Sequence, residues 1–223
     1  MKENKLSIQL RNVKVRRMII FAMLVAIEIV FCFTALGTLP IAGIPATTAH
    51  LPVIIACIIC GLPEIAGLGL ILGISSIIVF STSFAANPSS PFFSPFVING
   101  NWMSGITAII PRILFPIILY YLLKLVYKLK NNGIRTILVF LSALFATFCH
   151  SFMVLTCIFI NQTYLMKLPS AYFSFIMTGI GLNVVMEMLL AGLVGIVVAI
   201  RLRNIILPQE REESTKDDAI TGA

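Results

Sequence analysis

The stretch Trp102–Leu123, WMSGITAIIPRILFPIILYYLL, carries a single charged residue, Arg112, within an otherwise apolar run. A helix needs about 20 such residues to cross the hydrocarbon of a bilayer. We therefore predict a transmembrane helix here. The rest of the chain has the same character, since 59% of its residues are hydrophobic and only 11% are charged. A soluble domain usually carries about 25% charged residues, so the composition indicates that lipid is the solvent.

Five more apolar runs flank this one, and the second of the six is short. They cover Arg17–Leu36, Thr48–Gly61, Glu64–Ser81, Thr136–Ile160 and Tyr172–Ile200. Such runs are too long and too little alternating for barrel strands, and lipid leaves no partner for free backbone groups. The predicted fold is all-α and integral to the membrane, with six transmembrane helices. We expect a basic cytoplasmic segment at 1–16, a membrane domain at 17–203 and a polar, disordered tail at 204–223.

Basic residues predict the orientation of these helices. They gather before the first run, between the fourth and fifth, and after the sixth, whereas the other three connections hold only Lys167. The positive-inside rule then places both termini in the cytoplasm, as an even number of spans requires. We attribute the net charge of +7 to this orientation, not to binding of nucleic acid.

Charged residues are rare inside the predicted spans, and such residues usually face the bundle interior or a water-filled cavity. Arg112 and Glu187 are expected at similar depths, because both lie on helices that enter from outside. Two interpretations stay open. Either Arg112 and Glu187 form a structural ion pair, or Arg112 offers its two-pronged guanidinium to a substrate carboxylate while Glu187 binds a hydroxyl or amide.

Other polar residues are candidates for the same pocket. Asn183 precedes Glu187 by four residues and shares its helix face. The outer ends and middles of other spans hold His50, Thr48, Asn101, Trp102 and His150. They are candidates for an outward-facing pocket that binds a small solute. Hydrogen bonding between helices, without any ligand, is the alternative for each of them.

Small residues spaced by four predict close helix contacts. Gly69 and Gly73 favour packing inside the bundle. Ala22 and Ala26 favour either such packing or a partner surface, with Glu28 on the opposite side of the same helix, pointing inward. The chain has no phosphate-binding loop and no hydrolase or zinc-protease motif, and Cys57 and Cys60 lack further metal ligands. We therefore expect no cofactor, no metal and no catalytic residue.

In several of these segments the chain resembles the substrate-binding S components of energy-coupling factor (ECF) vitamin transporters, the pantothenate type in particular. The resemblance extends over roughly Arg16 to Arg203. It is carried by RRMIIFAMLVA at 16–26, by ATTAHLPVII at 46–55 with GLGLILGISS at 67–76, and by IPRIL at 110–114 with GLN at 181–183 and Glu187.

Membership of that family would imply a multi-pass protein of the bacterial cell membrane that binds a vitamin, pantothenate first, from outside. It would also imply partners: a transmembrane T component, which would meet Ala22 and Ala26, and two cytoplasmic ATPases that hydrolyse ATP. Other vitamins or precursors (hydroxymethylpyrimidine, folate, riboflavin, niacin) are alternative ligands. An intramembrane enzyme using His150 or Glu187 and a scaffold subunit are the alternative functions.

Overall fold

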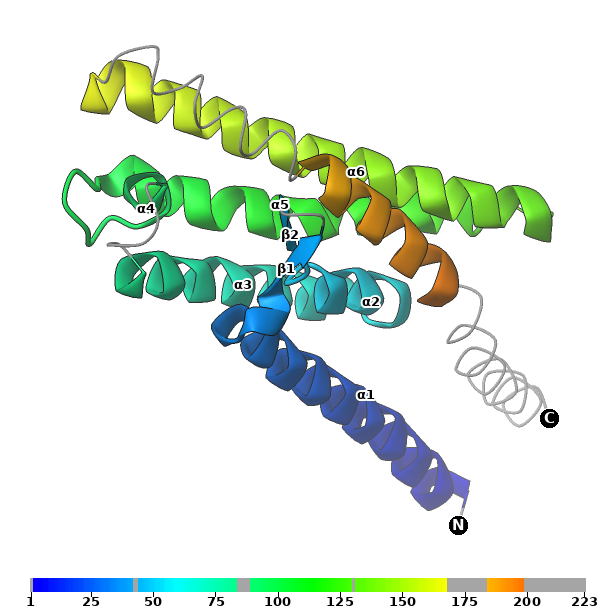
Figure 1. Cartoon of the computed structure of the whole chain (residues 1–223). Helices are drawn as coiled ribbons and strands as arrows, with labels where there is room; N and C mark the ends of the chain where they lie inside the picture. Colours follow the sequence, from blue (N-terminus) through cyan, green and yellow to red (C-terminus); the bar gives the residue numbers. More distant parts are fainter. Residues whose placement is uncertain (1, 42–43, 84–88, 130, 168–183, 199–223) are drawn as a thin grey trace.

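The computed structural model describes residues 2–41, 44–83, 89–129, 131–167 and 184–198, and this part of the chain is almost wholly helical (Figure 1). Its long helices are α1 (Lys2–Phe33), α3 (Leu62–Thr82), α5 (Trp102–Val126) and α6 (Asn132–Ile160). Shorter helices are α2 (Leu51–Ile59), α4 (Ser90–Phe93) and Val184–Val198, which carries no label.

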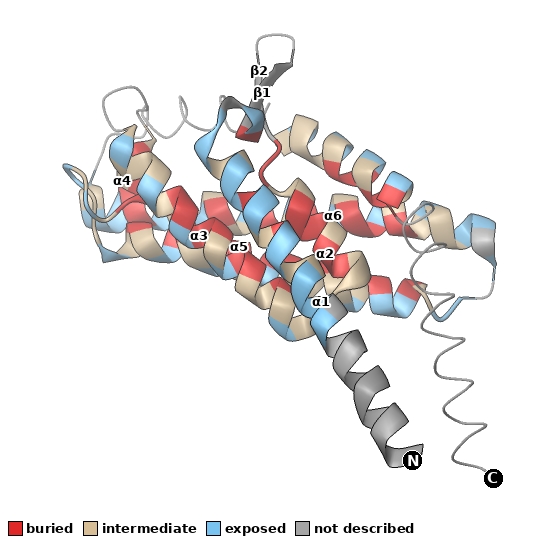
Figure 2. Cartoon of the chain, turned by 90° about the horizontal axis from the view of Figure 1, so that it is seen from below, coloured by how far each residue is buried: buried red, intermediate tan, exposed pale blue. Residues whose placement is uncertain are grey.

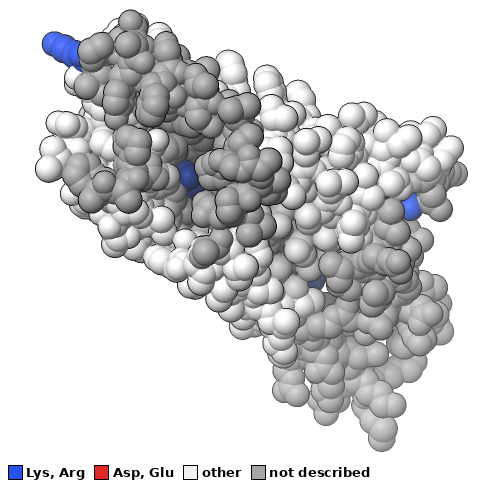
Figure 3. Space-filling model, viewed as in Figure 1, with Lys and Arg blue, Asp and Glu red and all other residues white. Residues whose placement is uncertain are grey.

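Three helices are long and apolar enough to cross a bilayer, namely Leu62–Thr82, Trp102–Val126 and Gly133–Met166. The chain is therefore a helical membrane protein. The visible face in Figure 3 agrees, since basic side chains appear on it only at isolated points and no acidic atom is seen among the described residues. The predicted sixth span, Tyr172–Ile200, lies partly outside the described residues, and the predicted tail lies wholly outside them.

Helix α2 is shorter than the predicted second span. It has nine residues, starts after His50 and gives way to extended backbone at Cys60. At 1.5 Å per residue it is about 13 Å long, less than half of the hydrocarbon thickness. Gly61 and Pro63 then start α3 directly, because proline is well suited to the first helical turn.

The described residues are almost wholly helical, as the all-α prediction expects, and a short two-stranded hairpin is added between the first two predicted spans. A 3-10 turn, Ala35–Gly37, leads into β1 (Thr38–Ile41), which pairs antiparallel with β2 (Ile44–Thr47). Pro40 and Pro45 stand opposite each other in this pair. Two prolines so close together prevent a helix, and strand pairing satisfies the remaining backbone groups instead.

The other element boundaries differ from the predicted ones mainly at helix ends. Helix α1 begins at Lys2, well before the predicted start at Arg17. Helix α6 continues into a π-helix, Asn161–Met166, which ends where Lys167 adopts a left-handed φ of 50°.

Helix α5 lies at the centre of the bundle. It packs between α3 and α6, while α1 crosses α2 and α3 (Figure 1). Buried residues gather on the facing sides of these helices, whereas much of α1 is exposed (Figure 2). The central residue Phe115 is 1% exposed, and Ile65 and Leu68 of α3 are 0% exposed. The side chains that α5 turns inward therefore lie in the core.

Candidate functional site

Arg112 sits on the buried face of α5, where two prolines and two glycines shape the backbone. Pro116 cannot donate a hydrogen bond, so the Arg112 carbonyl lacks its usual helical donor. Gly69 of α3 packs against this carbonyl so closely that a Cβ on Gly69 would lie 2.4 Å from the oxygen. Gly73 meets the next turn of α5 at Ile109 in the same way. The predicted close contact at Gly69 and Gly73 thus lies inside the bundle. It fixes the position of Arg112 along α5 relative to α3.

The Arg112 side chain is only 9% exposed, yet few of its donors are used. Nη1 donates to the carbonyl of Ala108 on its own helix at 2.8 Å. The guanidinium carbon lies 5.4 Å from the ring centroid of Phe93, a cation–π contact. Within the described residues, the buried Nε has no hydrogen-bond partner. A buried cation with unused donors is poised to bind an anion.

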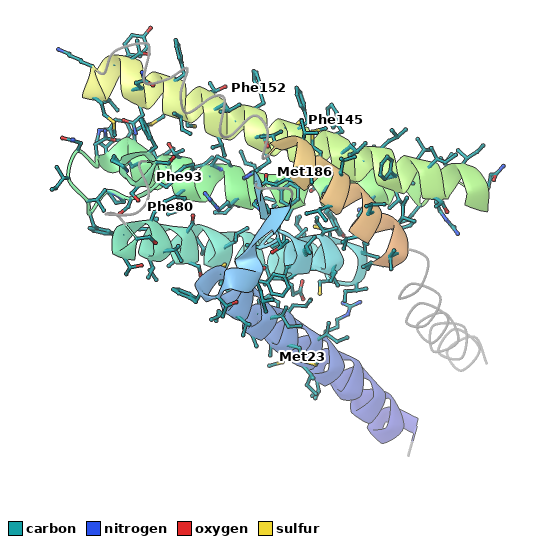
Figure 4. The ribbon with its side chains drawn as sticks, in the orientation of Figure 1. Met23, Phe80, Phe93, Phe145, Phe152 and Met186 are labelled. Atoms are coloured by element: carbon teal, nitrogen blue, oxygen red, sulfur yellow. The ribbon has the colours of Figure 1, made fainter. Side chains whose placement is uncertain are left out.

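Phe93 brings the loop between α3 and α5 over this guanidinium. It belongs to the short helix α4, is 7% exposed and stacks on Phe80 of α3 at a centroid distance of 4.7 Å. Figure 4 shows the two rings side by side near one end of the bundle. Ser94, just after α4, hydrogen-bonds Ser81 at 2.6 Å and so holds the loop down.

Two carboxylates, Glu28 and Glu187, lie within electrostatic range of Arg112. This attraction is what both interpretations, a structural ion pair and a shared ligand, require. Glu187 is partly buried on the helix Val184–Val198. Its predicted companion Asn183 lies outside the described residues.

Glu28 is a site residue that the predicted ligand set omits. It is 0% exposed, its Oε1 accepts only the Cys32 thiol at 3.6 Å, and its Oε2 has no partner among the described residues. An unpaired buried carboxyl group is costly and calls for a function. The helical spacing that points Glu28 inward was visible in the sequence.

Ala22 and Ala26 are exposed on the opposite side of α1, as the same spacing predicts. Met23, between them, is 60% exposed and points away from the bundle in Figure 4. The alanines thus face outward and do not pack within the described bundle. Their role as a partner surface stays a prediction.

His50 and His150 meet beside Arg112, although 100 positions separate them in the sequence. Their Nε2 atoms are 3.3 Å apart, and His150 Nδ1 lies 3.1 Å from the carbonyl oxygen of Pro111. Phe115 packs edge-on against both rings. His50 Nδ1 is buried without a hydrogen-bond partner among the described residues. Within the described part of the chain, the cluster therefore presents three polar atoms without a hydrogen-bond partner: Glu28 Oε2, His50 Nδ1 and Arg112 Nε.

Thr48, another predicted site residue, lies at the base of the hairpin. Its hydroxyl donates to the carbonyl of Leu36, and its backbone N–H donates to the carbonyl of Gly37 at 2.9 Å. It is 1% exposed. Its hydrogen bonds fix the base of the hairpin two residues before His50.

Asn101 and Trp102 lie about three turns away from Arg112, at the start of α5. Asn101 caps that helix by accepting from the Ser104 N–H, and its Nδ2 donates to Asn161 Oδ1 at 2.6 Å. Asn161 in turn donates to Ser104 Oγ at 3.2 Å, and Ser104 donates to the carbonyl of Pro91. Trp102 is 66% exposed, which suits an aromatic anchor at a membrane interface.

Replacing the buried Asn161 with leucine is expected to destabilise the fold, because it leaves the half-buried Asn101 amide without its acceptor. The cost should be about 1–3 kcal/mol. Thermal unfolding of the purified protein measures it, and Thr163→Ala, at an exposed position of the same π-helix, serves as the control. Equal melting temperatures for the two variants would show that these amides do not hold the loop, α5 and α6 together.

No family model matches the chain. Among characterised proteins, the chain is similar to the pantothenic acid transporter PanT of Lactococcus lactis subsp. cremoris, with 39% identity over 119 residues. The match covers 51% of this chain and 56% of that transporter. The chain thus spans about half the length of the curated relative it matches.

Proposed function

We propose that the chain is the substrate-binding S component of an ECF-type vitamin importer in the bacterial cell membrane, and that pantothenate is its ligand. The observation that carries the proposal is the buried guanidinium of Arg112, whose Nε has no hydrogen-bond partner among the described residues. The similarity to a protein named as a pantothenic acid transporter supports the choice of ligand.

Pantothenate matches the chemistry of the cluster. It carries one carboxylate for the guanidinium, and two hydroxyls and an amide for the other unpartnered polar atoms. A ligand of this kind supplies the hydrogen bonds that Arg112, His50 and Glu28 lack, and so removes the cost of burying them unpaired. An uncharged solute would bring no anionic acceptor to the unpartnered Nε of Arg112.

The test of this function is calorimetry with the full chain in detergent or nanodiscs. We expect pantothenate to bind stoichiometrically and tightly, and niacin, riboflavin and hydroxymethylpyrimidine to bind much more weakly or not at all. Absence of pantothenate binding, together with tight binding of another of these compounds, would transfer the function to that ligand.

The importer function further requires partners, a transmembrane T component and two ATPases, because the chain itself has no phosphate-binding loop. Co-expression with such a module should be necessary for ATP-dependent uptake by cells or vesicles. Uptake by the chain alone would contradict the S-component assignment and leave a transporter of another class.

Changing Ala22 and Ala26 together to leucine is expected to abolish co-purification with the T component. Bulky side chains prevent the close helix approach that alanines allow. Because both residues face away from the bundle, pantothenate affinity should stay within about twofold of wild type. Met23→Leu is the matched control on the same face and should still assemble. Normal assembly of the double variant would place the partner surface elsewhere.

A further inference from the structure

The two histidines of the chain form a directional hydrogen-bond chain that ends on an unused atom. A carbonyl oxygen only accepts, so His150 must carry its proton on Nδ1 to bond the Pro111 carbonyl. In a neutral ring, His150 Nε2 is then an acceptor. The Nε2 atom of His50, 3.3 Å away, must be the donor of that pair.

This assignment also fixes the protonation of the remaining ring nitrogen, His50 Nδ1. A neutral His50 that donates from Nε2 carries a lone pair on Nδ1. That atom is buried and has no donor among the described residues. We take both rings as neutral, because Arg112 already places one positive charge in this apolar interior and a second one would be costly to bury.

We infer that His50 Nδ1 accepts a hydrogen bond from an uncharged donor on the ligand, a hydroxyl or an amide N–H. His150 is a positioning residue that sets the direction of the hydrogen bond. The inference rests on the proposed function, in that the same ligand places its carboxylate on Arg112. Phe115, which holds both rings, is three residues beyond Arg112 on α5, about 4.5 Å along the axis. The donor and the carboxylate therefore belong to one small solute.

The tautomers can be measured without any ligand. Because the chain has only two histidines, selective 15N-imidazole labelling of the full chain in nanodiscs gives four ring-nitrogen signals. His150→Gln assigns them. We expect protonated Nδ1 and unprotonated Nε2 in His150, with the reverse in His50. A protonated Nδ1 in His50 would overturn the inference whatever the chain binds, so this failure is distinct from a failure to bind pantothenate.

A matched pair of variants tests the acceptor in the bound state. In His50→Asn the side-chain oxygen takes the place of Nδ1, whereas in His50→Gln the amide takes the place of Nε2 and keeps only the contact to His150. Pantothenate is compared with analogues in which each hydroxyl is replaced by hydrogen or the amide is N-methylated. Wild type should lose roughly 10-fold in affinity for one analogue, the effect of one buried hydrogen bond.

His50→Asn should retain most of that discrimination, and His50→Gln should bind pantothenate and the analogue with similar affinity. If His50→Gln discriminates between pantothenate and the analogue better than His50→Asn does, His50 only supports His150, and the inference is overturned. Equal discrimination in wild type and both variants would overturn it as well.

Discussion

Replacing Arg112 with alanine is expected to weaken pantothenate binding by roughly 100-fold or more. Removing one member of a buried charge pair costs about 2–5 kcal/mol, and about 1.4 kcal/mol corresponds to a factor of ten. Arg112→Lys should recover part of the loss, because it restores the charge but not the two-pronged geometry. Calorimetry of the purified variants measures both affinities.

The same substitution should leave the ligand-free fold intact. Among the described residues the guanidinium hydrogen-bonds Ala108 of its own helix and leaves its buried Nε without a hydrogen-bond partner. Burying such a donor costs free energy, so its removal relieves that cost. Arg112→Met, which keeps the volume, should melt at or above the wild-type temperature. A large fall in stability for Arg112→Met, or strong Arg112–Glu187 coupling in a double-mutant cycle, would favour a structural ion pair and a scaffold function instead.

Gly69→Ala is the second substitution with a large expected effect, here on stability. The new Cβ would lie 2.4 Å from the Arg112 carbonyl oxygen and 3.0 Å from Ile113 Cα, both backbone atoms, so α3 and α5 must move apart. We expect a loss of about 1–3 kcal/mol, as for other overpacked cores. Thermal unfolding measures the loss, and pantothenate affinity should fall with it because Arg112 moves with α5.

Gly67→Ala is the matched control, two residues earlier on the same helix. Its Cβ would come no closer than 3.6 Å to the Phe21 ring, an ordinary contact, and alanine favours a helix over glycine. This variant should be as stable as wild type or more so. If the two variants have the same melting temperature, the close approach at Gly69 does not hold α3 against α5.

Much of this architecture could be predicted from the helical spacing of residues in the sequence. The inward Glu28, the outward Ala22 and Ala26, and the contact through Gly69 and Gly73 all follow from residues three to four apart on one helix. A single charge in an apolar run likewise marked Arg112 as interior. These features depend on local periodicity alone, which is why one sequence suffices to find them.

Contacts between distant segments could not be predicted from local periodicity. Nothing local pairs His50 with His150, or Asn101 with Asn161, because these contacts depend on how α2, α5 and α6 pack. Asn101, a predicted ligand residue, also precedes a helix and caps it, and its position in the sequence already suggests that capping role. The hairpin of β1 and β2 was also not predicted, because it lies in the connection between the first two predicted spans and contains prolines, which strands usually avoid.

The aromatic side chains of α6 illustrate what the membrane adds to the packing. Phe145 and Phe152 are 55% and 63% exposed and project from the outer side of α6, while Met186 lies between the helices (Figure 4). In water such an apolar surface would be a binding patch. In a bilayer it is the lipid-facing side, so the polar cluster around Arg112 is the unusual feature, and the proposed function rests on it.

The central claim is that Arg112 binds the carboxylate of the ligand. The most direct measurement is a cycle of four affinities: wild type and Arg112→Ala, each with pantothenate and with the neutral analogue in which a primary alcohol replaces the carboxylate. Wild type should prefer pantothenate by roughly 100-fold, and the variant should bind the two compounds about equally. A preference for the carboxylate that persists undiminished in Arg112→Ala would contradict the claim.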